Sequence, residues 1–197
     1  MQLSIPGEAE GAQNAIEAVV EQVQAGDKQA YEDIITRFER QMYTYCYYIL
    51  KNHAETEDAV QEIFIRAYKN LHQYNRQVSF SAWLYKMAYH HLMNMKKKQG
   101  RWLKLVEHCK VQQSELQSSS NEPVVYELMA YLTMEERHIL LLKAVEEYTF
   151  EEIGEIICLK PATVRKKYQR LRQKLMERLS QERKRVHGTI AGTNGIR

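Results

Sequence analysis

A polar stretch between two blocks of helical hydrophobic periodicity constrains the fold of this chain most. Residues 112–123 are rich in Gln, Ser, Glu and Asn and contain few apolar side chains, a composition typical of linkers. On either side, apolar residues recur every three or four positions, as they do along one face of a helix. The 197 residues include only 8 glycines and 3 prolines that could break such helices. The pattern predicts an all-α fold of two small helical domains joined by a flexible linker.

Breaks in the pattern set the expected boundaries. Glycine and proline near the start predict a loose leader to about residue 12, followed by a helix from about Asn14 to Gln24. The end of the chain has glycines and no apolar stripe, so we expect a disordered basic tail. The expected segments are a leader with its helix (1–25), a first domain (26–98), a linker (99–123), a second domain (124–181) and the tail (182–197).

Each domain is expected to contain several helices. The first of them begins at Gly26-Asp27, where the glycine breaks the preceding helix and Asp27 supplies an N-cap. The helices that follow are expected at about Glu55–Leu71 and Phe80–Lys98 in the first domain, and near Val125–Leu132, Met134–Val145, Thr149–Ile157 and Pro161–Leu179 in the second.

Cysteine usage and missing motifs exclude several classes of protein. Cys46, Cys109 and Cys158 lie far apart without the paired spacing of a metal site or a disulfide framework, which favours a reducing cytosol. The chain has no apolar run of signal-peptide or membrane-spanning length. It has no glycine-rich phosphate loop, and His90-His91 lacks an accompanying catalytic motif. We expect a cytoplasmic, nucleoid-associated protein that is not an enzyme and has no cofactor or metal.

The segment from Thr149 to Leu175 has the spacing of a helix-turn-helix. Gly154 is small where the two helices must approach each other, and Pro161 suits a first helical turn because its missing N–H removes no hydrogen bond. In such motifs the start of the second helix reaches base edges in the major groove of DNA. The candidate DNA-reading residues are Thr163, Arg165, Lys166, Lys167, Gln169 and Arg170.

A second candidate surface lies on the helix expected from Glu55 to Leu71. Its polar residues lie three or four positions apart, opposite an apolar stripe that includes Phe64. Asp58 and Glu62 repel each other at this spacing, so a basic protein partner would relieve the repulsion. A purely solubilising face is the equal alternative. The candidate partner-binding residues are Asp58, Gln61, Glu62 and Ile65.

The helix expected from Phe80 to Lys98 has an aromatic and basic outer row. Aromatic rings stack on unpaired bases at about 1–3 kcal/mol per base, and neighbouring cations hold the phosphates of the strand. We interpret Trp83, at the start of this helix, as an anchor in the core rather than a stacking platform. The row consists of Lys86, His90, Asn94 and Lys97, with Tyr85, Tyr89 and Lys98 beside it.

The order of these motifs resembles the extracytoplasmic-function (ECF) subfamily of the sigma-70 family of RNA polymerase sigma factors. The resemblance rests on GDKQAYEDIITRFERQMYTYCYYIL, DAVQEIFIRAY, FSAWLYKMAYHHLMNMKKK and the helix-turn-helix, and covers about residues 26–98 and 124–178. It implies sigma region two and sigma region four, joined by a flexible stretch. It also implies a protein that binds core RNA polymerase and directs transcription initiation, with a stress or envelope-response regulon as the expected set of promoters.

The resemblance implies protein partners as well. Family members grip the clamp helices of the polymerase β′ subunit at positions that correspond here to Asp58, Gln61, Glu62 and Phe64. Because the periodicity turns Phe64 inward, we assign this contact to Ile65 in its place. Region four is expected to dock on the flap of the β subunit, and an anti-sigma factor is a further expected partner.

Promoter DNA is the other partner that the resemblance implies. The connector from about Tyr74 to Ala82 corresponds to the family's pocket for a flipped base of the minus-ten element, the helix after it lines the opened strand, and region four reads the minus-thirty-five element. The residues expected at the minus-ten element are Tyr74, Asn75, Ser79, Trp83, Lys86, Tyr89, His90, Asn94 and Lys97.

The chain departs from the family pattern at several positions. Tyr89-His90 stands where Arg-Asn is usual, and Asn94 where Asp is usual. Cys158 replaces a common glycine before the turn, and Tyr168 a leucine in the recognition helix. These changes leave the promoter sequence open. The alternative function is a helix-turn-helix transcriptional regulator that is not a polymerase subunit, which would require an N-terminal domain with a ligand pocket.

Overall fold

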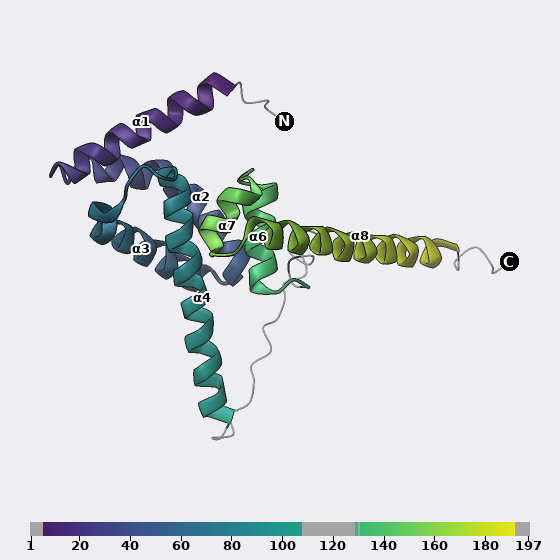
Figure 1. Cartoon of the computed structure of the whole chain (residues 1–197). Coiled ribbons are helices and arrows are strands. Elements are labelled where there is room, and N and C mark those ends of the chain that lie inside the picture. Colours follow the sequence, from purple (N-terminus) through teal and green to yellow (C-terminus); the bar gives the residue numbers. More distant parts are fainter. Residues whose placement is uncertain (1–5, 108–128, 130, 192–197) are drawn as a thin grey trace. The chain divides into compact units, whose positions relative to one another are not determined.

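Helices form every regular element in the part of the chain that the structure describes. This structure, a computed structural model, describes residues 6–107, 129 and 131–191. An N-terminal unit holds α1 to α4, and a C-terminal unit holds α6, α8 and most of α7 (Figure 1). The prediction of an all-α chain with two helical domains is confirmed.

In the N-terminal unit, α2 is the central element because it contacts α1, α3 and α4. Its buried stripe recurs at three- and four-residue steps, as the apolar periodicity predicts, and runs from Tyr31 to Ile49. The elements of this unit are α1 (Pro6–Gln24), α2 (Tyr31–Leu50), α3 (His53–Asn70), the short 3-10 helix η1 (Leu71–Gln73) and α4 (Phe80–Glu107).

Local sequence signals explain where these helices begin and end. Gly26 follows α1 with a φ of +110°, a backbone conformation that favours glycine. Asp27 accepts hydrogen bonds from the N–H groups of Gln29 and Ala30, but α2 itself begins only at Tyr31, later than the expected start at Asp27. At the start of α3, the side chain of Asn52 accepts a hydrogen bond from the N–H of Glu55 at 3.0 Å, an N-cap.

The C-terminal unit is built from α6 (Met134–Ala144), α7 (Phe150–Ile157) and α8 (Pro161–Ala191). Thr133 and Glu136 form a reciprocal capping box at the start of α6. The close approach expected at Gly154 is confirmed, because a Cβ there would lie 2.6 Å from the backbone oxygen of Leu159. Proline at the first position of α8 also agrees with the prediction.

Three helices are longer than expected. α1 begins at Pro6 and not near Asn14, α4 continues past Lys98 to Glu107, and α8 continues to Ala191 through the start of the segment expected to be disordered. Residues such as Gln, Glu, Lys and Arg favour helix even where no apolar stripe is present, so the lack of a stripe was a poor guide to helix ends. The helix expected at Val125–Leu132 lies mostly outside the described residues.

Candidate protein and nucleic-acid interfaces

The four partner-binding candidates of α3 lie on its accessible face, as predicted. Asp58 and Gln61 are exposed, Glu62 is partly exposed, and the side chain of Ile65 has 46% of its surface accessible. Phe64 is buried, so the assignment of this ring to the core is confirmed. We call Asp58, Gln61, Glu62 and Ile65 the α3 patch.

The charge of the α3 patch is partly balanced within the helix. Arg66 donates a hydrogen bond from Nε to a carboxylate oxygen of Glu62 at 2.6 Å, one turn away. This hydrogen bond lowers the pKa of Glu62, so the carboxylate stays charged at neutral pH. Arg66 thus offsets part of the repulsion between Asp58 and Glu62 that the helical spacing predicts.

An apolar groove continues the α3 patch toward α2. It has a volume of about 500 Å³ and is lined by Gln61 and Ile65 of the patch, with Ile35 from α2 and Tyr68 from α3 among its other walls. The rings of Tyr31 and Tyr68 meet edge to face, with centroids 4.9 Å apart. The surface available to a partner is therefore larger and more apolar than the four predicted residues alone.

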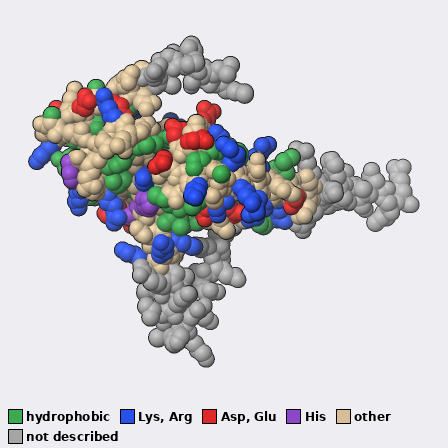
Figure 2. Space-filling view, viewed as in Figure 1, with side chains coloured by type: hydrophobic (Ala, Val, Ile, Leu, Met, Phe, Trp, Pro, Cys, Tyr) green, Lys and Arg blue, Asp and Glu red, His purple; other side chains and the backbone are tan. Residues whose placement is uncertain are grey.

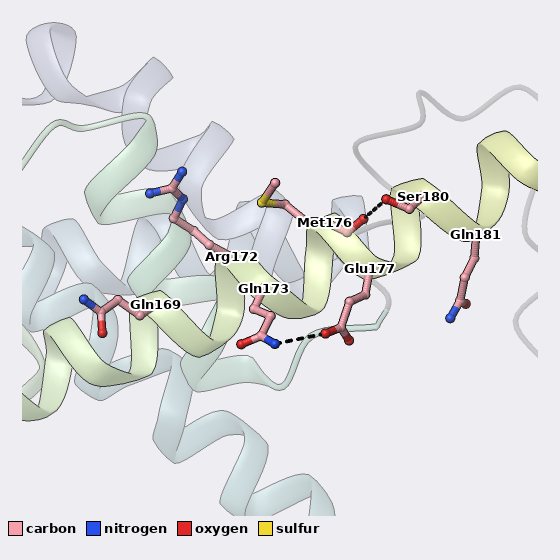
Figure 3. A pocket seen from close by; sticks show the side chains of 7 residues that line it. All are labelled: Gln169, Arg172, Gln173, Met176, Glu177, Ser180 and Gln181. Carbon is pink, nitrogen blue, oxygen red and sulfur yellow. Dashed lines mark hydrogen bonds between the residues drawn. The ribbon is translucent and has the colours of Figure 1, made fainter.

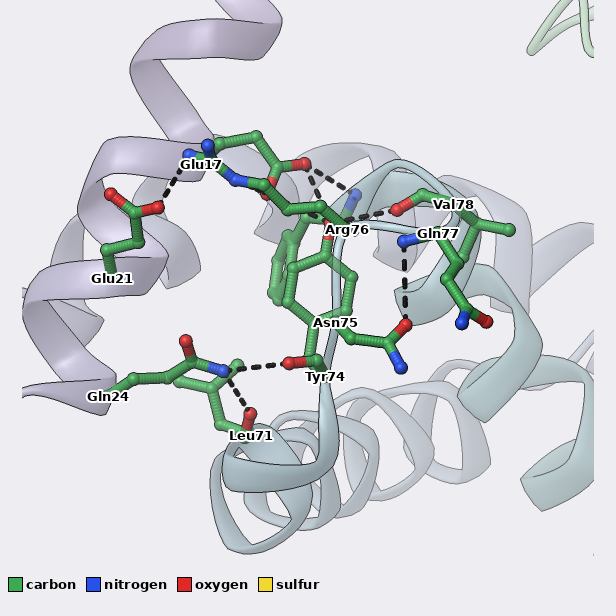
Figure 4. A network of polar contacts seen from close by, with 10 residues as sticks. Glu17, Glu21, Gln24, Leu71, Tyr74, Asn75, Arg76, Gln77 and Val78 are labelled. Atoms are coloured by element: carbon green, nitrogen blue, oxygen red, sulfur yellow. Dashed lines mark hydrogen bonds and ion pairs between the residues drawn. The ribbon is translucent and has the colours of Figure 1, made fainter.

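The connector between η1 and α4 differs from expectation at Tyr74. This ring was expected at DNA, but the structure buries it to 6% exposure against Phe80 and Trp83. Its hydroxyl lies 2.8 Å from a carboxylate oxygen of Glu17 and 2.9 Å from the backbone oxygen of Val78 (Figure 4). Burial, and then the hydrogen bond with Glu17, raises the pKa of Tyr74, so the hydroxyl remains a donor. Tyr74 supports the connector from within.

The other predicted connector residues are accessible. Asn75 is exposed, and its side-chain oxygen accepts a hydrogen bond from the N–H of Gln77 at 3.4 Å. Ser79 is partly exposed, and its hydroxyl accepts a hydrogen bond from the N–H of Ala82 at 3.2 Å, at the start of α4. The connector thus presents polar groups outward while its aromatic ring faces inward.

The outer row of α4 is accessible along its length, but Tyr85, which was expected beside it, is buried. His90, Asn94 and Lys97 are exposed, whereas Lys86 and Tyr89 are partly exposed. Tyr85 was expected beside this row and is instead buried to 1% exposure, where its ring meets Tyr45 edge to face at 4.9 Å.

The error at Tyr85 has a packing reason. The buried stripe of α4 includes Leu84, Tyr85, Ala88 and Leu92, so the inward face of the helix extends to Tyr85, which the prediction had put beside the outer row. Trp83 is partly exposed and packs against Tyr74 and Phe80, with ring centroids 5.4 and 5.6 Å away, which agrees with its interpretation as an anchor.

The DNA-reading candidates of α8 lie where the helix-turn-helix prediction placed them. Val164 and Leu171 are buried, and this fixes which face of the helix points outward. Thr163, Lys166, Gln169 and Arg170 are exposed.

The two remaining α8 candidates have acidic partners. Arg165 lies 3.5 Å from Glu151 and over the ring of Phe150, and Lys167 lies 2.9 Å from Glu135. A cation that is already paired gains less from a phosphate or a base than an unpaired one, because its existing partner must be released. Lys166 and Arg170 are therefore better candidates for DNA contact than Arg165 and Lys167.

A shallow hollow along α8 begins at Gln169, one of the DNA-reading candidates, and extends toward the C-terminal end of the helix (Figure 3). Gln173 donates a hydrogen bond to Glu177 at 3.1 Å, and Met176 is 63% exposed. Met176 is a large apolar side chain on an otherwise polar face of α8, a pattern already visible in the sequence. The hollow is lined by Gln169, Arg172, Gln173, Met176, Glu177, Ser180 and Gln181.

Among the helices described, none combines the length and the apolar character needed to cross a membrane. On the face drawn in Figure 2, Lys and Arg, Asp and Glu, and apolar side chains are mixed over the described residues.

Comparison with known proteins identifies both units. "Sigma-70 region 2" matches residues 34–101, and "Sigma-70, region 4" matches residues 124–175. The ECF RNA polymerase sigma factor SigW of Bacillus subtilis is 29% identical over 176 residues, which cover 81% of this chain and 94% of SigW. The ECF RNA polymerase sigma-E factor of Haemophilus influenzae is 27% identical over 180 residues, which cover 83% of this chain and 94% of that protein.

Solved structures share the fold at lower identity. CnrH, in a complex with the cytosolic domain of CnrY, has a TM-score of 0.63 at 18% identity and covers 83% of this chain and 96% of CnrH. The sigma factor RpoE of Bartonella quintana, in a complex with the anti-sigma factor NepR, has a TM-score of 0.64 at 15% identity and covers 76% of this chain and 96% of RpoE. Both regions and the full-length relatives agree: the chain belongs to the extracytoplasmic-function subfamily of the sigma-70 family of RNA polymerase sigma factors.

Proposed function

We propose that this sigma factor binds core RNA polymerase through its N-terminal unit and reads promoter DNA with both units, as a cytoplasmic binding subunit that performs no catalysis. One observation carries the proposal. A single chain combines an acidic and apolar patch on α3 with two polar, basic faces on α4 and α8. A ligand-sensing regulator would not require the α3 patch, so the polymerase-subunit function accounts for more of the surface.

The α3 patch suits the basic clamp helices of the β′ subunit. Charge complementarity would speed association and orient the two proteins, while Ile65 and the adjoining groove supply apolar area. An exposed isoleucine at the centre of a charged face costs little in the free protein and gains from burial in a complex. The β′ subunit is therefore the partner that we assign to this patch.

The outer row of α4 and the connector suit the minus-ten element after its strands separate. Asn75 and Ser79 offer hydrogen-bonding groups to a base edge, and Lys86 and Lys97 lie along the helix that follows. A basic row holds phosphates without reading sequence, whereas a loop that carries amide and hydroxyl groups can discriminate bases. We assign base selection to the connector and strand retention to α4.

The exposed start of α8 suits the major groove of the minus-thirty-five element. Thr163 and Lys166 lie in its first two turns, and Gln169 and Arg170 lie in the next. Residues at the N-terminal end of a recognition helix reach base edges, and cations farther along hold the backbone. Docking of the same unit on the β flap belongs to the proposal as well.

Charge reversal tests the division of labour between the units. Asp58→Arg with Glu62→Arg places cations against the basic surface assigned to β′, and we expect affinity for core polymerase to fall by about tenfold or more, equivalent to about 1.4 kcal/mol. Lys166→Ala with Arg170→Ala should leave that affinity unchanged and weaken promoter binding, with a shallower dependence on salt. Polymerase affinity is measured by fluorescence titration, and promoter use by transcription in vitro.

A matched control separates the patch from net charge. Asp33→Arg reverses an exposed aspartate on α2, outside the α3 patch, and should retain parental affinity for polymerase. If Asp33→Arg weakens polymerase binding as much as Asp58→Arg with Glu62→Arg does, or if the two doublets have the same effect, the assignment of separate roles is wrong. If the parental protein yields no promoter-dependent transcript with core polymerase, the proposed function itself is wrong.

We also propose an inhibitory protein partner of the anti-sigma type. Two solved structures of the same fold are complexes, one of CnrH with the cytosolic domain of CnrY and one of the sigma factor RpoE with the anti-sigma factor NepR. The α3 patch and its groove give such a partner an acidic and apolar surface that overlaps the one assigned to polymerase. Purification of the tagged protein from unstressed cells should recover a stoichiometric inhibitor. Recovery of the free sigma factor alone, at full transcriptional activity, contradicts this proposal.

A further inference from the structure

Helix α1 carries a buried carboxylate toward the connector. Glu17 is 6% exposed, although glutamate is rarely buried without compensating partners. The sequence does not predict the burial of Glu17, because the neighbouring row of Ile16, Val20 and Val23 predicts only a helix that packs on a core. The matched region 2 begins at residue 34, so α1 lies outside the segment that the family comparison recognises.

Within the described residues, the polar contacts of the Glu17 carboxylate go to the connector and to the start of α4 (Figure 4). The N–H of Phe80 donates to one carboxylate oxygen at 3.0 Å. The hydroxyl of Tyr74 lies 2.8 and 2.9 Å from the two oxygens, and Nε of Arg76 lies 3.5 Å from the second. One side chain of α1 thus holds both ends of the 74–80 segment.

A second residue of α1 holds the other side of the same segment. Nε2 of Gln24 donates to the backbone oxygen of Leu71 at 2.8 Å and to that of Tyr74 at 3.0 Å. Both contacts are to main-chain atoms. They therefore fix the path of the backbone, whereas the contact of Glu17 with the Tyr74 hydroxyl fixes a side chain. Together, Glu17 and Gln24 restrain the backbone from η1 to α4 at its two ends.

The restrained segment leaves its middle available. Asn75, Arg76 and Gln77 are exposed between the two buried anchors, Tyr74 and Phe80. A loop selects among ligands only when its polar groups are held in place before binding, since otherwise each ligand orders it differently. Hydrogen bonds to a buried carboxylate supply such restraint because charged acceptors bind more strongly than neutral ones.

We propose that α1 is a positioning element for base selection, in which Glu17 holds the connector in the shape that discriminates bases of the minus-ten element. Glu17 itself contacts no DNA and acts through Tyr74 and the N–H of Phe80. This inference rests on the proposed function of the connector. It adds that a helix outside the matched sigma region contributes to the choice of promoter.

The alternative is that Glu17 contributes only to stability, and matched variants separate the two roles. Glu17→Ala removes the carboxylate and leaves two buried donors without it. Val20→Ala weakens the packing of the same helix at a residue that is 1% exposed, but it removes no hydrogen bond to the connector. Glu21→Ala removes only the surface ion pair with Arg76 at 3.1 Å. Glu17→Gln retains an oxygen that can accept from the N–H of Phe80.

The experiment uses the full chain with core RNA polymerase and a template library in which the minus-ten element is randomised. Transcripts are sequenced to obtain the base preference at each position. For Glu17→Ala we expect the preference at one or two adjacent positions to fall about fivefold or more, the size of a weak single-base discrimination. Glu17→Gln should lose less, while Val20→Ala and Glu21→Ala should keep the parental profile.

The outcomes distinguish the inference from the function on which it rests. If the parental protein shows no base preference, the proposed function fails. If the parental protein shows one and Glu17→Ala either keeps it or shares its loss with Val20→Ala, the positioning role of Glu17 is wrong. Helical content is checked by circular dichroism. Should Glu17→Ala fail to fold, Tyr74→Phe removes the hydroxyl from the same network. We expect it to reduce the base preference at the same positions of the minus-ten element.

Discussion

The two units hold their proposed DNA-contacting elements by different means. In the N-terminal unit, α1 holds the connector through hydrogen bonds from Tyr74 and the Phe80 N–H to the buried carboxylate of Glu17. In the C-terminal unit, α8 is held by close contact between backbones at Gly154 and by the buried side chains of Val164 and Leu171. One arrangement is polar and directional, whereas the other is apolar and steric.

From this difference we can predict which amino-acid substitutions each unit should tolerate. Directional hydrogen bonds hold a connector whose middle residues are polar and exposed, so single polar substitutions should alter its shape and leave the fold intact. Close packing fixes a long helix as a rigid body, so a substitution that disturbs it should affect the entire unit. Three predictions test this contrast, from the largest expected effect to the smallest.

The largest effect is expected at Gly154. In Gly154→Ala the added Cβ would lie 2.6 Å from the backbone oxygen of Leu159, which cannot rotate away as a side chain can. We expect a loss of about 3 kcal/mol, the upper end of overpacking costs. Hydrogen exchange measured by mass spectrometry should show reduced protection across residues 134–175 and unchanged protection across α2 and α3.

Gly11→Ala is the control for this substitution. A Cβ at Gly11 meets no atom within 4 Å, and the residue lies within α1. Alanine there should raise stability by up to about 1 kcal/mol through helix propensity alone. Equal protection of the C-terminal unit in Gly154→Ala and the parent would show that its packing is adjustable, contrary to the contrast drawn above.

The next largest effect is a loss of folding stability at acidic pH, caused by the buried His138 of α6. Burial lowers the pKa of His138 to about 3, from an ordinary value of 6.5. The unfolded chain therefore takes up a proton in a range where the folded chain does not, and protons favour unfolding. The contribution to stability is complete above pH 6.5 and is lost as the pH falls toward 3, which amounts to about 2 kcal/mol at pH 5.

Urea unfolding at pH 7 and pH 5, followed by circular dichroism, measures this effect. His138→Leu is the matched variant, because it cannot take up a proton in either state. The variant isolates His138 from His90 and His91, whose pKa values are also lowered by partial burial. The parent should lose more stability than the variant on acidification, and an identical loss in both would exclude His138 as the source.

The smallest effect is expected at Gln24. Gln24→Ala removes two hydrogen bonds, to the backbone oxygens of Leu71 in η1 and of Tyr74 in the connector, and both contacts are only partly buried. We expect a loss of about 1 kcal/mol in urea unfolding, since water replaces part of each bond. Gln22→Ala, an exposed glutamine of the same helix, should change stability by less than about 0.5 kcal/mol. Equal effects of the two substitutions would deny Gln24 its role as a support.

The sequence predicted the helix-turn-helix and the α3 patch well because both depend on local periodicity. The apolar steps along α8 determine that Val164 and Leu171 face inward and Lys166 faces outward, and the structure agrees. On α3 the same argument correctly placed Phe64 inside. Periodicity was less reliable on α4, where Trp83, Tyr85 and Tyr89 are all large aromatic residues and only the packing against α2 and α3 decides which of them is buried. Tyr85 was misplaced for that reason.

Periodicity determined that this chain forms two sets of amphipathic helices, and the order of its motifs determined the family. Only the tertiary structure decided that Glu17 and Gln24 meet the connector, because hydrogen bonds between residues as far apart as Glu17 and Phe80 leave no pattern in the sequence. Likewise, Tyr74 became a support and Arg165 and Lys167 became paired through contacts with other helices. A side chain's partners depend on which helices pack together, and helical repeats specify faces without specifying neighbours.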